Sequence, residues 1–148
     1  ILMYRVQFDK IGTAFKEIYL KDIRPIKNIK NDEILIKILC FPINPADLLL
    51  VEGKYANTPR LPSKIGAECV AKVIKVGNNI KNFKKNDIVM PLIRDNWVEQ
   101  KIVKNNQIIK LPPSIDILQA SMLKVNPATA YLMLNNYVKV NKGDYIIQ

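Results

Sequence analysis

Short runs of alternating or continuous apolar residues dominate the first two thirds of the chain. Residues 4–8 read Tyr-Arg-Val-Gln-Phe, and this alternation predicts a half-buried strand. Residues 14–20 are predicted to form its partner strand, after a turn at Gly12. Residues 33–41 predict a longer and strongly apolar strand, which Pro42 ends. The chain therefore begins with β structure.

The middle of the chain continues in the same way. Further strands are predicted over residues 68–76, 97–103 and 107–111, and residues 83–90 are predicted to form a turn followed by a strand. Gly77 ends the first of these in a turn, and Asn86 occupies a turn position that suits a left-handed backbone. Many short strands separated by Pro, Gly and Asn turns predict a barrel or a sandwich.

The period of the apolar residues changes after residue 113. Ser114 or Asp116 is expected to cap a helix that runs through Met122. Residues 127–138 predict a second helix, and residues 143–148 turn into a new apolar strand. The C-terminal part is therefore expected to be helical up to that last strand.

Composition narrows the class of protein. The chain has 148 residues, enough for one domain, with no apolar run of the roughly 20 residues that span a bilayer and no visible signal peptide. Cys40 and Cys69 lie in apolar runs and predict two buried thiols rather than a disulfide. We expect a protein of the bacterial cytoplasm or of an organellar matrix, with no membrane partner.

The charge suggests an acidic partner more than a nucleic acid. The net charge is +10, but the lysines are scattered and arginine, which carries most phosphate and base recognition, is scarce. We therefore expect no nucleic-acid binding. The sequence contains no histidine, which removes the commonest metal ligand and general base.

Two stretches carry candidate chemistry. The first, residues 43–55, starts a helix with Asn44 as cap and Pro45 at the first helical position, and ends in a polar loop with the phenol of Tyr55. The second, residues 125–131, reads Val-Asn-Pro-Ala-Thr-Ala-Tyr and begins another helix, with Asn126 as its cap. Capping alone is enough to explain either asparagine.

These stretches, together with Pro-Ser-Lys-Ile-Gly-Ala-Glu at residues 62–68, resemble the catalytic half of the medium-chain dehydrogenase/reductase superfamily. They look most like its zinc-free 2-enoyl thioester reductases, which are close to the quinone oxidoreductases. The resemblance implies one domain over residues 1–148 that is mainly β with a few helices: a chaperonin-10 (GroES)-like distorted barrel. Its C-terminus would enter the first strand of an absent Rossmann domain, and no Gly-x-Gly-x-x-Gly loop occurs in the sequence.

The same resemblance implies roles for particular residues. Tyr55 would be the catalytic proton donor, and Asn44, Asn126 and Thr129 would contact the nicotinamide end of NADPH. The positions of the family's zinc-binding Cys and His read Asn44 and Ala67, so no metal site is expected.

Three other residues are candidates for structural roles. Glu68 and Asp47 are expected to be structural. Trp97 would either line an acyl pocket or belong to the core or the edge of a strand.

Three functions follow from this interpretation. The first is the catalytic domain of an NADPH-dependent enzyme that reduces the C2=C3 bond of 2-enoyl thioesters in fatty acid synthesis, inactive as this fragment alone. The second is an NADPH:quinone oxidoreductase domain, and the third is a non-catalytic binding module left by a truncated gene. Expected partners are a small-molecule or carrier-bound acyl thioester, an acyl carrier protein and, in the full-length protein, a second copy of the chain.

Overall fold

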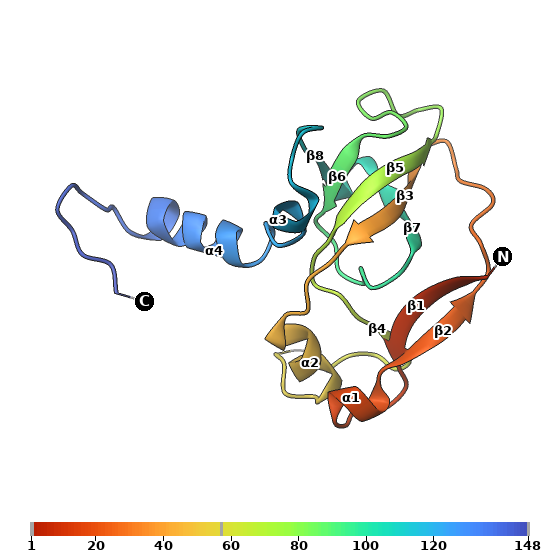
Figure 1. The fold of residues 1–148 in the computed structure, drawn as a ribbon, viewed down its shortest axis with the longest axis horizontal. Coiled ribbons are helices and arrows are strands. Elements are labelled where there is room, and N and C mark those ends of the chain that lie inside the picture. Colours follow the sequence, from red (N-terminus) through yellow and green to blue (C-terminus); the bar gives the residue numbers. More distant parts are fainter. Residues whose placement is uncertain (1, 57, 148) are drawn as a thin grey trace.

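The computed structural model describes residues 2–56 and 58–147, and their strands form two antiparallel sheets (Figure 1). The three-stranded sheet has the order β2-β1-β4, with β1 (Met3–Phe8), β2 (Tyr19–Ile23) and β4 (Ser63–Lys64). The five-stranded sheet has the order β7-β3-β5-β6-β8, with β3 (Glu33–Cys40), β5 (Val70–Val76), β6 (Ile88–Pro91), β7 (Gln100–Lys104) and β8 (Ile108–Lys110).

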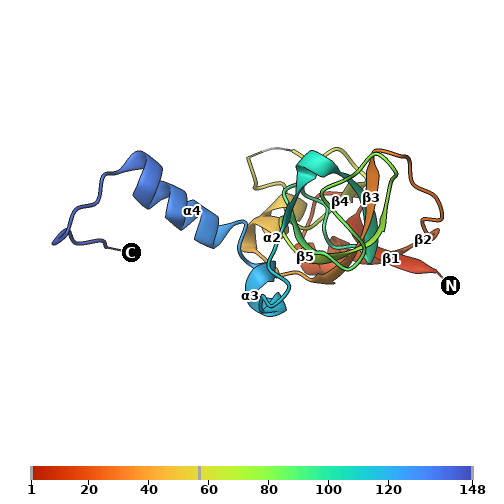
Figure 2. The ribbon, with the colours of Figure 1, turned by 90° about the horizontal axis from the view of Figure 1, so that it is seen from above.

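The helices are short and lie at the edges of this body. They are α1 (Ala14–Glu17), α2 (Pro45–Val51), the 3₁₀ turn η1 (Asn105–Gln107), α3 (Ile117–Ser121), α4 (Asn126–Leu132) and the π-helical η2 (Met133–Tyr137). Figures 1 and 2 both show α4 and the segment after it extending away from the two sheets. No helix in the described part of the chain is long and apolar enough to cross a membrane.

Each sheet has its own core. In β3, Ile34, Ile36 and Ile38 point inward while Lys37 is exposed, as a period of two requires. They pack against β5 and β7 through residues such as Val73. The second core gathers side chains from the smaller sheet, the first two helices and the loop before Val98: Phe8, Ala14, Val51, Ile65 and Trp97.

The sheets do not close into one barrel. In the described part of the chain they form separate ladders, and an isolated antiparallel bridge joins Arg5 of β1 to Val98, just before β7. The prediction of a mainly β, GroES-like fold is confirmed. The described strands form two separate sheets rather than a closed barrel.

Most of the predicted elements are present. The strands at residues 4–8 and 33–41 are confirmed, and so are the start of α2 after Asn44 and the cap of α3, where the Asp116 carboxylate accepts a hydrogen bond from Gln119 N. Asn86 has a φ of 75°, as its turn position suggested.

Three local predictions are wrong. Residues 14–20 do not form one strand, because α1 occupies their first part and the partner of β1 begins at Tyr19. Residues 144–147 pair with no described strand, and Tyr145 and Ile147 are each 96% exposed; a strand is stable only beside a hydrogen-bonded neighbour. Gln148 lies outside the described residues. Trp97 precedes β7 rather than opening a strand.

The two cysteines differ, which corrects the prediction of two buried thiols. Cys69 is buried, and burial raises the pKa of its thiol to about 12, whereas Cys40 is partly exposed. Only the thiolate is strongly nucleophilic. We therefore expect iodoacetamide at pH 8 to alkylate Cys40 in the native protein and to leave Cys69 unmodified, as read by peptide mass spectrometry. Equal labelling of both cysteines without unfolding would contradict this.

Candidate functional site

The buried carboxylate of Glu68 joins two predicted site segments. Glu68 is 1% exposed, and its Oε1 accepts a hydrogen bond of 3.0 Å from Asn44 Nδ2. Its Oε2 accepts a bond of 2.9 Å from the backbone N–H of Val125. The first contact holds the start of α2 and the second holds the residue before α4. The prediction that Glu68 is structural agrees with this geometry.

Asp47 also binds the start of α2. The region where Asn44, Glu68 and Val125 meet is called the corner below. The fully buried carboxylate of Asp47 accepts the N–H of Asn44 at 3.1 Å and that of Ala67 at 2.9 Å. Burial raises the pKa of Asp47, while these two bonds and the charge of Arg94 act in the opposite direction. Asp47 therefore holds the backbone N–H of Asn44, and Glu68 holds its side-chain amide and so orients that side chain.

Two cations complete the cluster, and sequence reasoning missed both. Lys124 Nζ donates to the carbonyl oxygen of Ala67 at 2.7 Å and to that of Ile93 at 3.4 Å. Its pKa is lowered, first by burial and then by the positive charge of Arg94, while Glu68 opposes this shift. Because lysines are scattered along the sequence, no spacing or motif singles out Lys124 or Arg94.

Tyr55 lies in the loop after α2, beside this cluster. Its side chain is 38% exposed, and the guanidinium carbon of Arg94 is 5.4 Å from the centre of its ring. A cation at this distance is attracted by the face of the ring and restricts its orientation. No described residue forms a hydrogen bond to the Tyr55 hydroxyl, so this phenol remains available to a ligand.

Asn126 and Thr129 lie on the first turn of α4, and both are exposed. Helix α4 begins at Asn126 itself, one residue earlier than predicted, so Val125 rather than Asn126 is the cap. The hydroxyl of Thr129 donates to Val125 O at 2.6 Å and keeps its lone pairs as acceptors. Through Val125 and Glu68, the structure brings this turn to the same corner as Asn44.

These groups fit one end of a nicotinamide cofactor. The exposed Asn126 amide and the Thr129 oxygen offer the donor and acceptor groups that a carboxamide needs. A dinucleotide also needs a cradle for its phosphates, and the sequence contains no Gly-x-Gly-x-x-Gly loop.

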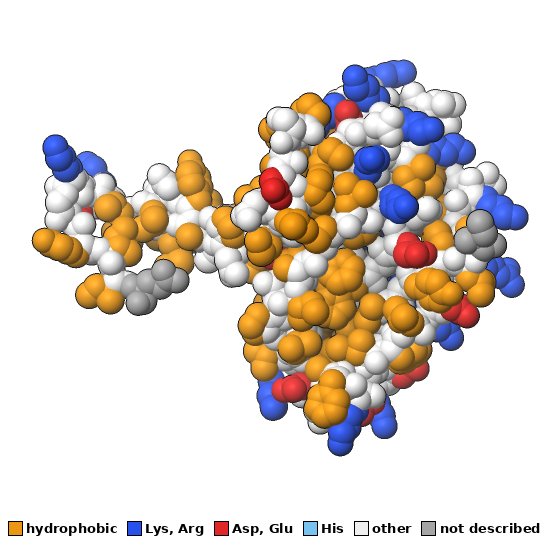
Figure 3. Space-filling model, in the orientation of Figure 1, with side chains coloured by type: hydrophobic (Ala, Val, Ile, Leu, Met, Phe, Trp, Pro, Cys, Tyr) orange, Lys and Arg blue, Asp and Glu red, His pale blue; other side chains and the backbone are white. Residues whose placement is uncertain are grey.

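An apolar face lies next to the polar corner. Figure 3 shows hydrophobic side chains spread over the region around α2 and the end of β3, and the exposed members include Phe41, Ile43, Leu48 and Leu49. Phe41 stacks on Trp97 with 5.4 Å between ring centres. Trp97 is itself buried within the second core, which agrees with a core position for this residue.

The described part of the chain contains no group of three or more His, Cys, Asp or Glu side chains arranged to hold a metal ion. At the corner itself, the carboxylates of Glu68 and Asp47 accept hydrogen bonds from protein donors. The absence of a metal from this site remains a prediction, which metal analysis of the purified protein tests.

Gly66 allows the Gly66–Glu68 segment to pass close to the loop before β7. Its φ is +114°, and a Cβ atom there would lie 2.6 Å from Trp97 N and 2.7 Å from Asn96 N. We expect Gly66→Ala to lower the free energy of unfolding by more than about 2 kcal/mol, through backbone strain and this clash. Chemical denaturation of the parent protein and the variant measures this difference in the free energy of unfolding.

Gly143→Ala is the matched control. Gly143 also has a positive φ, +100°, but nothing lies within 4 Å of its Cβ position. The Gly143→Ala variant shares the backbone strain but not the clash, so it should lower the free energy of unfolding by clearly less than Gly66→Ala does. Equal effects of the two substitutions would show that close packing at Gly66 is unimportant.

The fold and this corner define a class: a two-sheet β domain whose polar site lies beside the start of a projecting helix. Residues 30–113, more than half of the chain, match the family described as the alcohol dehydrogenase GroES-like domain. The chain belongs to this family.

Individual proteins similar to this chain are reductases and oxidoreductases. The chain is 37% identical over 123 residues to the mitochondrial enoyl-[acyl-carrier-protein] reductase of Dictyostelium discoideum, which covers 81% of this chain and 35% of that protein. A solved complex of Etr1p with NADP and crotonyl-CoA superposes with a TM-score of 0.85 at 27% identity, over 95% of this chain and 45% of the other. The quinone oxidoreductase of Coxiella burnetii superposes with a TM-score of 0.77 at 26% identity, over 91% and 45%. The chain thus spans less than half the length of each of these three proteins.

Proposed function

We propose that this chain is the catalytic GroES-like part of an NADPH-dependent reductase that acts on the C2=C3 bond of 2-enoyl thioesters. The observation that carries the proposal is the position of Tyr55: its phenol is exposed, lies beneath the Arg94 cation, and adjoins the corner built on Asn44, Glu68 and Val125. The enoyl reductase relatives support the substrate class.

The residues of this chain would serve the protonation step. NADPH, when bound, would supply the hydride for the β-carbon of the enoyl group. Tyr55 would then donate its hydroxyl proton to the α-carbon of the enolate, and the resulting phenolate would recover a proton from water. Arg94 lies close enough to favour the negative charge that passes from enolate to phenolate.

The cofactor contacts are proposed as a set. Asn126 and Thr129 would bind the carboxamide of the nicotinamide, and Asn44 would limit its position from the facing helix. The choice of NADPH is supported by the Etr1p complex with NADP. The remainder of the cofactor would be bound by a nucleotide-binding domain, which the relatives' greater length allows.

The alternative substrate is a quinone, which the Coxiella burnetii neighbour favours. The third possibility is a binding module without catalysis, which the basic net charge supports.

For the proposed enzyme, an acyl carrier protein is a suitable partner, since its acidic surface would complement a net charge of +10. The mitochondrial reductases among the relatives support an organellar location, and a dimeric assembly is supported by the Etr1p/Etr2p heterodimer of Candida tropicalis.

One assay compares these functions. The chain is joined to the nucleotide-binding half of a relative, and NADPH oxidation is followed with crotonyl-CoA and separately with a benzoquinone. The proposal predicts a higher kcat/KM for crotonyl-CoA. A preference for the quinone would favour the alternative, and binding of an acidic carrier with no turnover of either substrate would favour the module.

A further inference from the structure

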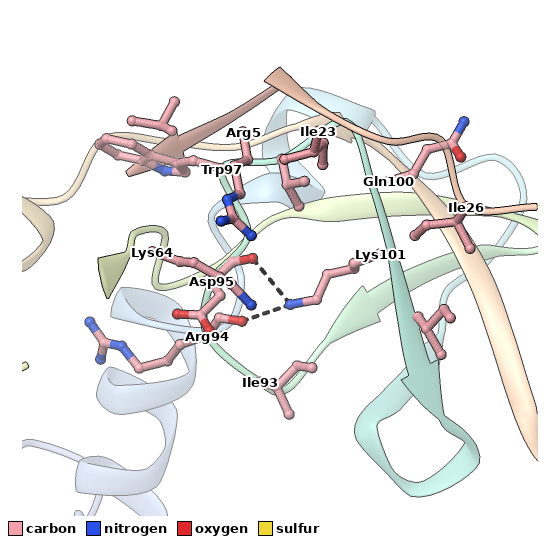
Figure 4. Close-up of a pocket in the computed structure, with 13 residues that line it drawn as sticks. Arg5, Ile23, Ile26, Lys64, Ile93, Arg94, Asp95, Trp97, Gln100 and Lys101 are labelled. Carbon is pink, nitrogen blue, oxygen red and sulfur yellow. Dashed lines mark hydrogen bonds between the residues drawn. The ribbon is translucent and has the colours of Figure 1, made fainter. Parts of the chain in front are cut away.

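A second hollow, distinct from the corner at Asn44, lies between the two sheets. It has a volume of about 460 Å³ and is bounded by β1, by β7 and by the segment from Ile93 to Val98. Figure 4 shows its lining side chains, with Ile23 and Ile26 on one wall and charged residues on the other. This is enough space for a small ligand.

The charged wall is strongly positive. Arg5, Lys64, Arg94 and Lys101 all line the hollow, and Asp95 is the acidic residue among the lining side chains. None of these four cations forms an ion pair within the described part of the chain. Elsewhere in the chain, lysines such as Lys104 and Lys110 do pair with carboxylates. The excess of unpaired positive charge is therefore a feature of this hollow.

Lys101 is the cation fixed most firmly in place. Its Nζ donates to the carbonyl oxygens of Arg94 at 2.7 Å and Asp95 at 3.2 Å (Figure 4). It also donates to Asn96 Oδ1 at 3.2 Å. All three N–H groups are used, so it contributes charge rather than a free donor. Its pKa is lowered by burial, and Lys64 adds to this shift while Asp95 opposes it. An anion would relieve this mutual repulsion.

Free donors come from the neighbouring residues. Arg5 uses its Nε to reach Gln7 Oε1 at 2.9 Å, and its terminal nitrogens have no hydrogen-bond acceptor among the described residues. The ammonium of Lys64 likewise has no such acceptor among them. A guanidinium with two open nitrogens can bind a phosphate or carboxylate in a bidentate manner.

We propose that this hollow is a binding site for a phosphate-bearing small molecule, with Arg5 and Lys64 as donors and Lys101 as a fixed positive charge. A phosphate suits the site because several cations are needed to balance it, whereas a single carboxylate would leave most of the charge uncompensated. The hollow shares Arg94 with the proposed active site, but its assigned donors Arg5 and Lys64 and its fixed charge Lys101 have no role in the proposed reduction, so anion binding can be tested without turnover.

The chain carries its own reporter for this site. Trp97 is the single tryptophan of the sequence and lines the hollow. Its buried Nε1 has no hydrogen-bond partner in the described structure. Titration with inorganic pyrophosphate should change the Trp97 fluorescence in a saturable manner, with a Kd below about 1 mM at low salt. Raising the ionic strength should weaken binding.

Two variants test the assignment. Arg5→Gln and Lys64→Gln should each weaken pyrophosphate binding about tenfold or more, because each removes a charged donor. The matched control is Lys72→Gln, which removes the same charge from an exposed position on β5 away from the hollow. It should change the affinity by less than about twofold. Thermal unfolding verifies that all three variants fold.

Two results would overturn the site: a signal that never saturates, or a Lys72→Gln effect as large as that of Arg5→Gln. The first would show weak, general attraction to a basic protein. The second would place the anion elsewhere.

The source of the phosphate is separated by a second titration. Coenzyme A binding more tightly than pyrophosphate, with the same loss in Arg5→Gln, would identify a nucleotide-bearing thioester carrier as the ligand. Equal affinities for coenzyme A, pyrophosphate and inorganic phosphate would identify a site for free phosphate. Both results support the anion site, and neither requires turnover.

Discussion

Replacing Tyr55 by phenylalanine is expected to reduce enoyl thioester reduction by about 10²-fold or more, in the protein that joins this chain to a nucleotide-binding half. The substitution keeps the ring under Arg94, 5.4 Å from its guanidinium carbon, and removes only the hydroxyl. Because the hydroxyl donates a proton in the step after hydride transfer, kcat should fall while KM changes much less. Steady-state kinetics with crotonyl-CoA and NADPH measure both.

Tyr4→Phe is the control for this experiment. Tyr4 lies on β1 and is 43% exposed, close to the 38% of Tyr55, so it tests the loss of a similar phenol elsewhere. Its turnover should match that of the parent protein. An unchanged kcat in Tyr55→Phe would show that water or another group delivers the proton, and the proposed role of Tyr55 would be wrong.

Replacing Glu68 by alanine is expected to lower the free energy of unfolding by about 3 kcal/mol. Two donors, Asn44 Nδ2 and Val125 N, would lose their acceptor in a site that is 1% exposed. The partly buried Lys124 would also lose a nearby negative charge. For a chain of this length, this corresponds to a decrease in Tm of roughly 10 °C, measurable by calorimetry.

Glu99→Ala provides the comparison. Glu99 also accepts a backbone hydrogen bond, from Tyr4 N at 3.1 Å, but it is exposed to solvent. Water can replace the carboxylate there, so the decrease in Tm should be no more than about 2 °C. Similar decreases for the two variants would mean that the Glu68 network does not stabilise the corner between α2 and α4.

Local patterns predicted several elements correctly. The strongly apolar run that Pro42 ends became β3, and Asn44 followed by Pro45 marks the start of α2 by cap and fixed φ. Asn86 adopts the left-handed backbone that its turn position suggested. These features depend on a few adjacent residues, so the sequence contains the information they need.

The same reasoning failed where the outcome depended on a distant partner. Residues 14–20 contain enough apolar residues for a strand, but Ala14 is buried in the second core and the first turn of the segment becomes α1. Residues 144–147 have a strand-like composition but no neighbouring strand in the described structure. Closure of a barrel likewise depends on how two sheets meet, and no local period reports it.

By itself, the sequence determined the mainly β class, the start of α2 and the three motifs that mark the family, because each is written in neighbouring residues. Tertiary structure alone decided that Glu68 joins Asn44 to Val125, that Arg94 lies over Tyr55, and that Arg5, Lys64 and Lys101 surround one hollow. These residues come from segments 24 to 96 positions apart. Only the folded chain brings them together, because no local pattern in the sequence records contacts between residues so far apart, and charges and hydrogen bonds act strongly only at short distance.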